Sequence, residues 1–134
     1  MEYELEKSPH AVFSLTYHLV WCVKYRCKVL HGEVDRSLKE CLERTAETID
    51  IKIISMETDQ DHVHLLFSCR PAHTLSKIVN ALKAVSARQM FKKYPKLKDK
   101  LWKGHLWSPA YFVTTTGQTT LEQIRKYVES QKQK

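Results

Sequence analysis

The chain has 134 residues, of which 43% are hydrophobic and 28% charged, a balance typical of one globular domain and not of a disordered chain. Lys and Arg outnumber Asp and Glu by 22 to 15, which gives a net charge of +7 and a pI near 9.3. This excess favours a polyanionic partner such as nucleic acid, although a basic surface that only maintains solubility is compatible with it.

Cysteine spacing and the apolar pattern exclude several other classes of protein. No C-x-x-C pair is present, so neither a zinc ribbon nor a disulfide framework is expected, and most cysteines should be buried in a reducing compartment. No signal peptide or membrane-spanning run is recognisable, which favours a cytoplasmic protein without membrane contact. Only three glycines occur and none forms a phosphate loop, so no nucleotide cofactor is expected.

The chain alternates between strand and helix patterns after a loosely held stretch at residues 1–10. In order we expect a strand over 11–23, a helix over 33–49, strands over 51–58 and 62–69, a helix from Thr74 to about Tyr94, a strand over 109–115 and a last helix over 118–134. Thr119 and Glu122 have the spacing of a capping box that opens this last helix.

The order β-α-β-β-α-β-α predicts an α+β, ferredoxin-like fold of the split βαβ (RRM-like) type. Two helices should cover one face of an antiparallel sheet, and the last helix should lie on the other face. We expect one domain over residues 1–134, because no linker or repeat interrupts the pattern.

The segment D-H-V-H-L-L-F places two histidines in the third strand of the sheet. Side chains alternate across a strand, so His62 and His64 share one face, while Val63, Leu65 and Phe67 share the other. The apolar three should pack under the two helices, which leaves both imidazoles on the open face. Two imidazoles on one face can bind a single metal ion, although structural or surface histidines would show the same pattern.

The last helix carries a phenol and an amide beside its packing stripe. Tyr127 and Gln131 are four residues apart and therefore stacked, and Gln131 lies close to Ile124 on a helical wheel. A phenol can act as a covalent nucleophile, although a single tyrosine is more often a packing residue. Imidazole and amide ligands suit Mn²⁺, or Mg²⁺ when phosphate and water complete its shell.

These segments together resemble the TnpA-type transposases, small single-tyrosine members of the HUH (His-hydrophobic-His) nuclease superfamily. The resemblance rests on D-H-V-H-L-L-F, W-S-P-A-Y-F-V and I-R-K-Y-V-E-S-Q, with Y-H-L-V-W-C-V-K-Y-R and F-K-K-Y-P in support, and it runs from about Ala11 to Gln131. It implies a DNA transposase in which His62, His64 and Gln131 bind Mg²⁺ or Mn²⁺ and Tyr127 is the nucleophile.

The resemblance also implies a substrate and an assembly. The substrate would be single-stranded DNA with hairpins at the element ends, cut to a 5′-phosphotyrosine and a free 3′-OH. The protein would be a homodimer in which the tyrosine helix completes the histidine site of its own subunit or of the partner.

Two other functions remain open from the residues. One is a relative that processes repeated chromosomal (REP) hairpins or nicks DNA to start replication; the other is a non-catalytic single-stranded nucleic-acid-binding module. Phosphate contacts are suggested by charge at six positions, which are Lys24, Arg26, Lys28, Arg88, Lys92 and Lys93. Trp102 and Trp107 could stack on bases or anchor the core.

Overall fold

The structure, a computed structural model, describes residues 6–7, 12–13, 15–101, 104–115 and 121–131. Its elements in chain order are β1 (Glu6–Lys7), β2 (Val12–Phe13), β3 (Leu15–Cys22), the 3-10 turn η1 (Lys24–Arg26), α1 (Gly32–Thr48), β4 (Lys52–Asp59), β5 (His62–Cys69), α2 (Leu75–Lys93), α3 (Leu97–Lys100), β6 (Phe112–Thr115) and α4 (Leu121–Ser130).

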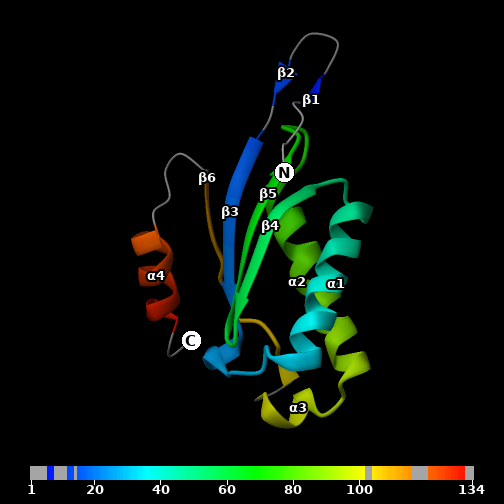
Figure 1. Ribbon diagram of the computed structural model, residues 1–134, viewed down its shortest axis with the longest axis vertical. Helices are drawn as coiled ribbons and strands as arrows, with labels where there is room; N and C mark the ends of the chain where they lie inside the picture. Colours follow the sequence, from blue (N-terminus) through cyan, green and yellow to red (C-terminus); the bar gives the residue numbers. More distant parts are fainter. Residues whose placement is uncertain (1–5, 8–11, 14, 102–103, 116–120, 132–134) are drawn as a thin grey trace.

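Four strands form one antiparallel sheet in the order β4-β5-β3-β6. The helices α1 and α2 lie together on one face of this sheet, and α4 lies on the other, beside β3 and β6 (Figure 1). This confirms the predicted α+β, ferredoxin-like fold. The two central strands, β3 and β5, are paired along their whole length, from Leu15 opposite Cys69 to Cys22 opposite His62.

The main core lies between the sheet and the helices α1 and α2. The side chains of Val63, Leu65 and Phe67 are fully buried there, as the alternation along this strand predicted. They pack with apolar residues of β3, α1 and α2, among them Leu19, Trp21, Leu38, Leu42, Val79 and Leu82. Burial of a large apolar side chain stabilises the fold by roughly 1.5–3 kcal/mol each, so this cluster dictates which way β5 faces.

Trp107 belongs to this core and is therefore an anchor of the fold. Its ring packs edge-on against Trp21, with ring centroids 5.6 Å apart, and its indole N–H donates to the Ser86 hydroxyl at 2.9 Å. A tryptophan with both its ring and its N–H satisfied inside the protein has little surface left for a base. The stacking interpretation does not hold for Trp107, and Trp102 lies outside the described residues.

A second, smaller cluster lies on the opposite face, beneath α4. It consists of Val20 and Cys22 from β3 with Ile124 and Val128 from α4, and the rings of Phe112 and Tyr127 flank it. Ile124 and Val128 are four residues apart, so they form the buried stripe of the helix. This packing holds α4 against the side of the sheet that carries the two histidines.

Element boundaries differ from the predicted ones where loops and turns intervene. Residues 95–108, between the predicted helix and the last predicted strand, contain the short helix α3, and that strand begins at Phe112 rather than at Pro109. Thr74 precedes α2 as expected, but its side chain makes no capping hydrogen bond. Residue 14 within the first predicted strand and most of residues 1–10 lie outside the described residues, as does the Thr119 half of the predicted capping box.

Three of the four cysteines (Cys22, Cys41 and Cys69) are buried and Cys27 is partly buried, all as free thiols. In the described part of the chain, no helix has both the length and the apolar character needed to cross a bilayer.

The orientation of β5 can be tested with one leucine from each of its faces. Leu65→Ala should lower the free energy of unfolding by about 2–5 kcal/mol, because Leu65 is fully buried in the main core. The matched variant Leu66→Ala, on the half-buried opposite face, should lose clearly less. Urea denaturation measures both, and equal losses would contradict the orientation of the strand.

Candidate active site

His62 and His64 both lie on the face of β5 opposite the main core, and both are half-buried. This is the side of the sheet on which α4 lies. In the ladder His62 is opposite Cys22 and His64 is opposite Val20, the two β3 residues on which α4 packs. The predicted histidine pair is therefore next to the contact surface of the tyrosine helix, because core packing on one face of β5 turns its alternate residues to the other.

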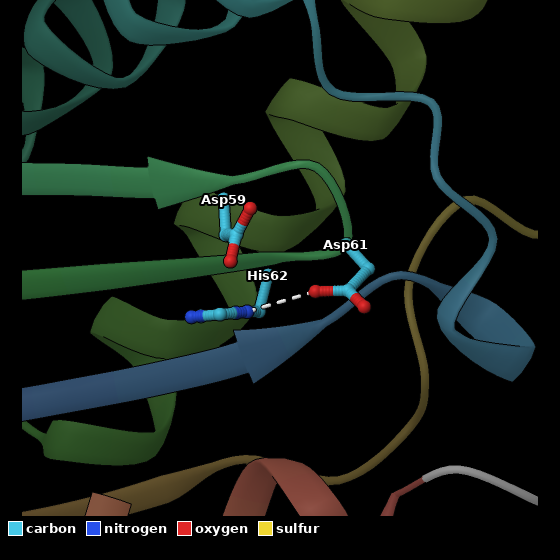
Figure 2. Close-up of side chains that lie close together, drawn as sticks. All are labelled: Asp59, Asp61 and His62. Carbon is cyan, nitrogen blue, oxygen red and sulfur yellow. Dashed lines mark hydrogen bonds and ion pairs between the residues drawn. The ribbon is translucent and has the colours of Figure 1, made fainter. Parts of the chain in front are cut away.

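The ring of His62 is held from behind by Asp61. The Asp61 carboxylate accepts a hydrogen bond from His62 Nδ1 at 2.9 Å (Figure 2). Its other oxygen is bound by Arg26 through Nε at 3.0 Å and Nη2 at 2.9 Å. Burial raises the pKa of the Asp61 carboxyl, but the His62 hydrogen bond and the Arg26 charge together outweigh it, so the net pKa lies below its ordinary value.

His64 has a different partner, the imidazole of His18 on the neighbouring strand. His18 Nδ1 lies 3.0 Å from His64 Nε2, and the tautomers decide which ring donates. Burial, followed by the nearby His18, lowers the pKa of His64, and Glu57 on β4 opposes this shift only in part. Burial also lowers the pKa of His18. Both rings are thus kept neutral, and the neutral imidazole is the form that can bind a metal.

Tyr127 lies on the inner side of α4, with its ring against Phe112 at a centroid distance of 5.5 Å. Burial, with a smaller contribution from Cys22, raises the pKa of its phenol to about 12. Among the described residues its buried hydroxyl has no hydrogen-bond partner. The protein side chains around Tyr127 therefore keep the phenol protonated, and an additional group is needed to make it a nucleophile.

Gln131 directly follows the last residue of α4 and is buried, as its place on the packing stripe suggested. Its Oε1 accepts a long hydrogen bond of 3.4 Å from the Ser108 hydroxyl, and its Nε2 donates to the Ser130 hydroxyl at 3.3 Å. A buried amide with long contacts retains hydrogen-bonding capacity, so its oxygen is a plausible ligand atom by its chemistry.

The four predicted residues lie on the same side of the sheet and come from two separate segments. His62 and His64 come from β5. Tyr127 comes from α4, which packs on β3 beside them, and Gln131 directly follows that helix. In the described part of the chain, no hydrogen bond joins either histidine to Tyr127 or Gln131. The donor set of two imidazoles and an amide oxygen fits a divalent ion such as Mn²⁺ or Mg²⁺.

Acidic side chains form a second possible ligand group at the start of β5. Within the described residues, Asp59, Asp61 and His62 each have a ligand atom within 4.8 Å of the others (Figure 2). The group does not include His64, and both oxygens of Asp61 already accept hydrogen bonds. Asp59 is exposed. Proximity alone does not make this trio a metal site.

The six basic residues predicted to contact DNA lie in two separate parts of the chain, three on α2 and three in or just after η1. Arg88, Lys92 and Lys93 are exposed on α2, which covers the sheet face opposite the histidines. Lys28 is exposed in the loop after η1, whereas Lys24 is partly buried. The guanidinium of Arg26 pairs with Asp61. Their role in DNA binding stays a prediction for all six.

The sequence pattern does not predict three of the side chains that hydrogen-bond to the candidate site residues. Asp61 directly precedes the H-V-H segment, and its spacing could have marked it as a companion of His62. His18 becomes a neighbour of His64 only through the β3–β5 register, which places His18 opposite Leu66. Ser108 reaches Gln131 through the chain segment that follows Trp107.

Comparison with known proteins identifies a family that this chain matches. The family described as "Transposase IS200 like" (Y1_Tnp) matches residues 11–131. The ISDra2 transposase TnpA of Deinococcus radiodurans is 49% identical over 131 residues, which cover 98% of this chain and 94% of that protein. The transposase for insertion sequence element IS200 of Salmonella typhimurium is 30% identical over 127 residues, covering 94% and 83%.

Solved structures agree with this sequence similarity. A crystal structure of a Deinococcus radiodurans R1 protein assigned as a transposase superposes with a TM-score of 0.91 at 40% identity, covering 96% of this chain and 99% of that one. A REP-associated tyrosine transposase bound to a REP hairpin superposes with a TM-score of 0.56 at 12% identity, covering 92% and 68%. The second likeness is one of fold alone.

The lowered pKa values of His18 and His64 predict a stability that falls in acid. Below about pH 6.5 the unfolded chain binds protons on these imidazoles before the folded protein does, so the free energy of unfolding should decrease as the pH falls. Urea denaturation of metal-free protein at about pH 7.5 and about pH 5.5 measures this change. The His18→Gln/His64→Gln variant should lose less on acidification; an unchanged dependence would contradict the assignment.

Proposed function

Because this chain belongs to the family of IS200-like transposases, we propose that it cuts and rejoins single-stranded DNA through a covalent link to Tyr127. The observation that carries the proposal is the joint placement of an imidazole pair, a buried amide and a buried phenol on one face of the sheet. Each residue alone has a structural explanation, but their combination on one side of the sheet supports a catalytic site.

In this proposal His62, His64 and Gln131 hold a divalent ion, Mg²⁺ or Mn²⁺, whose positive charge polarises the scissile phosphodiester and offsets the charge that develops on it. The imidazole of His64 suits this role, because its lowered pKa favours the neutral form, from which no proton has to leave before a metal binds. The buried hydroxyl of Tyr127, which has no hydrogen-bond partner among the described residues, also fits, since its high pKa requires an electropositive neighbour before the phenol can ionise.

The reaction we propose conserves the energy of the phosphodiester. The Tyr127 oxygen attacks phosphorus, its O–H proton is lost, and a new O–P bond forms while the bond from phosphorus to the 3′ oxygen breaks. The leaving oxygen takes up a proton and becomes a free 3′-OH, and the 5′ end stays on Tyr127. A 3′-OH of another strand can reverse these steps, so no nucleotide cofactor is required.

The substrate and assembly that we propose are single-stranded DNA with hairpin-marked transposon ends and a homodimer. Net charge supports a polyanionic partner, and exposed basic residues on α2 provide phosphate contacts. The small apolar cluster between α4 and β3 supports a helix that can be supplied by either subunit, because few contacts have to be exchanged.

The nucleophile can be tested by removing one oxygen atom. Tyr127→Phe should abolish the covalent protein–DNA adduct, because the ring still packs on Phe112 but has no oxygen to attack phosphorus. The measurement is a denaturing gel after incubation with Mn²⁺ or Mg²⁺ and a labelled single strand that carries a hairpin end.

Binding of the same strand in a mobility-shift assay should stay close to that of the unaltered protein. Tyr111→Phe, a second half-buried tyrosine near β6, serves as the matched control and should form the adduct normally. An adduct with Tyr127→Phe would show that another residue is the nucleophile.

The metal role can be tested at His64. His64→Ala should reduce metal-dependent cleavage on the order of 100-fold or more, because it removes a ligand from the ion that polarises the phosphodiester. The exposed His31→Ala should cleave at the normal rate. Cleavage rates over a Mn²⁺ series provide the measurement, and normal cleavage by His64→Ala would remove His64 from the metal site.

A further inference from the structure

Asp61 is a buried acid whose two oxygens have separate partners. It is 5% exposed, its Oδ2 accepts from Arg26, and its Oδ1 accepts from His62 Nδ1. A buried carboxylate persists in a fold only when its charge and lone pairs are satisfied, and here both conditions are met. With Oδ2 taken by the guanidinium, Oδ1 is the oxygen left to bind the imidazole (Figure 2).

The contact determines which nitrogen of His62 carries the proton. An ionised carboxylate can only accept hydrogen bonds, so His62 Nδ1 must donate. In the neutral ring the lone pair is then on Nε2, the atom directed away from Asp61. Histidine in water favours the opposite tautomer, with the proton on Nε2, so the carboxylate selects the form that exposes Nε2 as a ligand.

The backbone around the ion pair is fixed from two sides. Val23 N–H donates to the Asp61 carbonyl and Leu30 N–H donates to the Gln60 carbonyl, both at 2.9 Å. Between them, Tyr25 and Arg26 adopt left-handed conformations with φ of 56° and 52°. Two consecutive left-handed residues other than glycine are unfavourable and persist only where the surroundings hold them. This turn returns the Arg26 side chain to Asp61.

We propose that Asp61, held by Arg26, is a positioning residue that orients the His62 ring with its Nε2 lone pair toward the metal site. The proposal rests on the proposed function, in which His62 is a metal ligand. It assigns Arg26 a role inside the protein, and it makes Asp61 a support of the ligand and not a ligand, because both of its oxygens are occupied.

The tautomer of His62 can be read directly from the unaltered, metal-free protein. Long-range ¹H–¹⁵N correlation spectra of ¹⁵N-histidine-labelled protein near pH 7.5 should show His62 with a protonated Nδ1 and an unprotonated Nε2, assigned by the loss of its signals in His62→Gln. A His62 ring protonated on Nε2 alone would overturn the proposal without involving metal or DNA.

Metal affinity tests the consequence of this orientation. Asp61→Ala should weaken Mn²⁺ binding roughly 10–100-fold, measured by electron paramagnetic resonance in the absence of DNA. Asp61→Asn retains an oxygen acceptor for His62 Nδ1 and should recover part of this affinity. Asp59→Asn is the matched control, because it removes the exposed carboxylate of the same cluster, and it should bind Mn²⁺ normally.

Asp61→Ala leaves the partly buried Arg26 guanidinium without its counter-charge, so it can also destabilise the fold. The double variant Arg26→Met/Asp61→Ala removes that charge. It should regain thermal stability and still bind Mn²⁺ weakly, because His62 has no acceptor in either protein. If the double variant regained Mn²⁺ affinity together with thermal stability, the positioning role would be overturned.

The remaining outcomes separate this proposal from the proposed function. Normal Mn²⁺ binding by Asp61→Ala, with binding lost in His62→Ala, would overturn the positioning role and leave His62 as a ligand. Normal binding by His62→Ala would overturn the metal site itself. A loss in Asp59→Asn as large as in Asp61→Ala would show that the carboxylates coordinate the ion directly, which also overturns the proposal.

Discussion

Side-chain alternation along the two central strands is the constraint on which the arrangement of this protein depends. In β5 the residues Val63, Leu65 and Phe67 are buried against α1 and α2, so His62 and His64 can only face the other way. In β3 the same rule sends Trp21 into the main core and Cys22 beneath α4. A shift of either strand by one residue would turn its core side chains to the α4 side and its polar side chains into the core. Apolar packing on one face of the sheet therefore positions the polar side chains on the other.

The open face collects ionisable groups whose charges are suppressed or paired. Burial lowers the pKa of His18 and His64 and raises the pKa of the Tyr127 phenol, while the hydrogen bond from His62 and the charge of Arg26 hold the pKa of the Asp61 carboxyl below its ordinary value. Under the proposed function, such a site would be inactive by itself, because burial holds the pKa of the Tyr127 phenol at about 12 and the phenol does not ionise at neutral pH. Cleavage would then wait until DNA and a metal ion are present together.

Membership of the IS200-like transposase family and the two-sided sheet together suggest a division of labour between the faces. The candidate site lies under α4, whereas exposed basic residues of α2 lie on the opposite side. The contact between α4 and the sheet is small and apolar, which suits a helix that is docked as a unit and does not determine the fold.

Periodicity in the sequence was enough to determine the fold class, the order of the main elements and the face on which His62 and His64 lie, because each depends on residues close together in the chain. Helical spacing likewise placed Tyr127 and Gln131 on the inner side of the last helix. The tertiary structure alone decided the contacts between distant segments, which are Arg26 with Asp61, His18 with His64, Ser108 with Gln131 and Trp107 with Trp21. Such contacts depend on strand register and on the path of η1 through left-handed backbone, and neither leaves a periodic signal in the sequence.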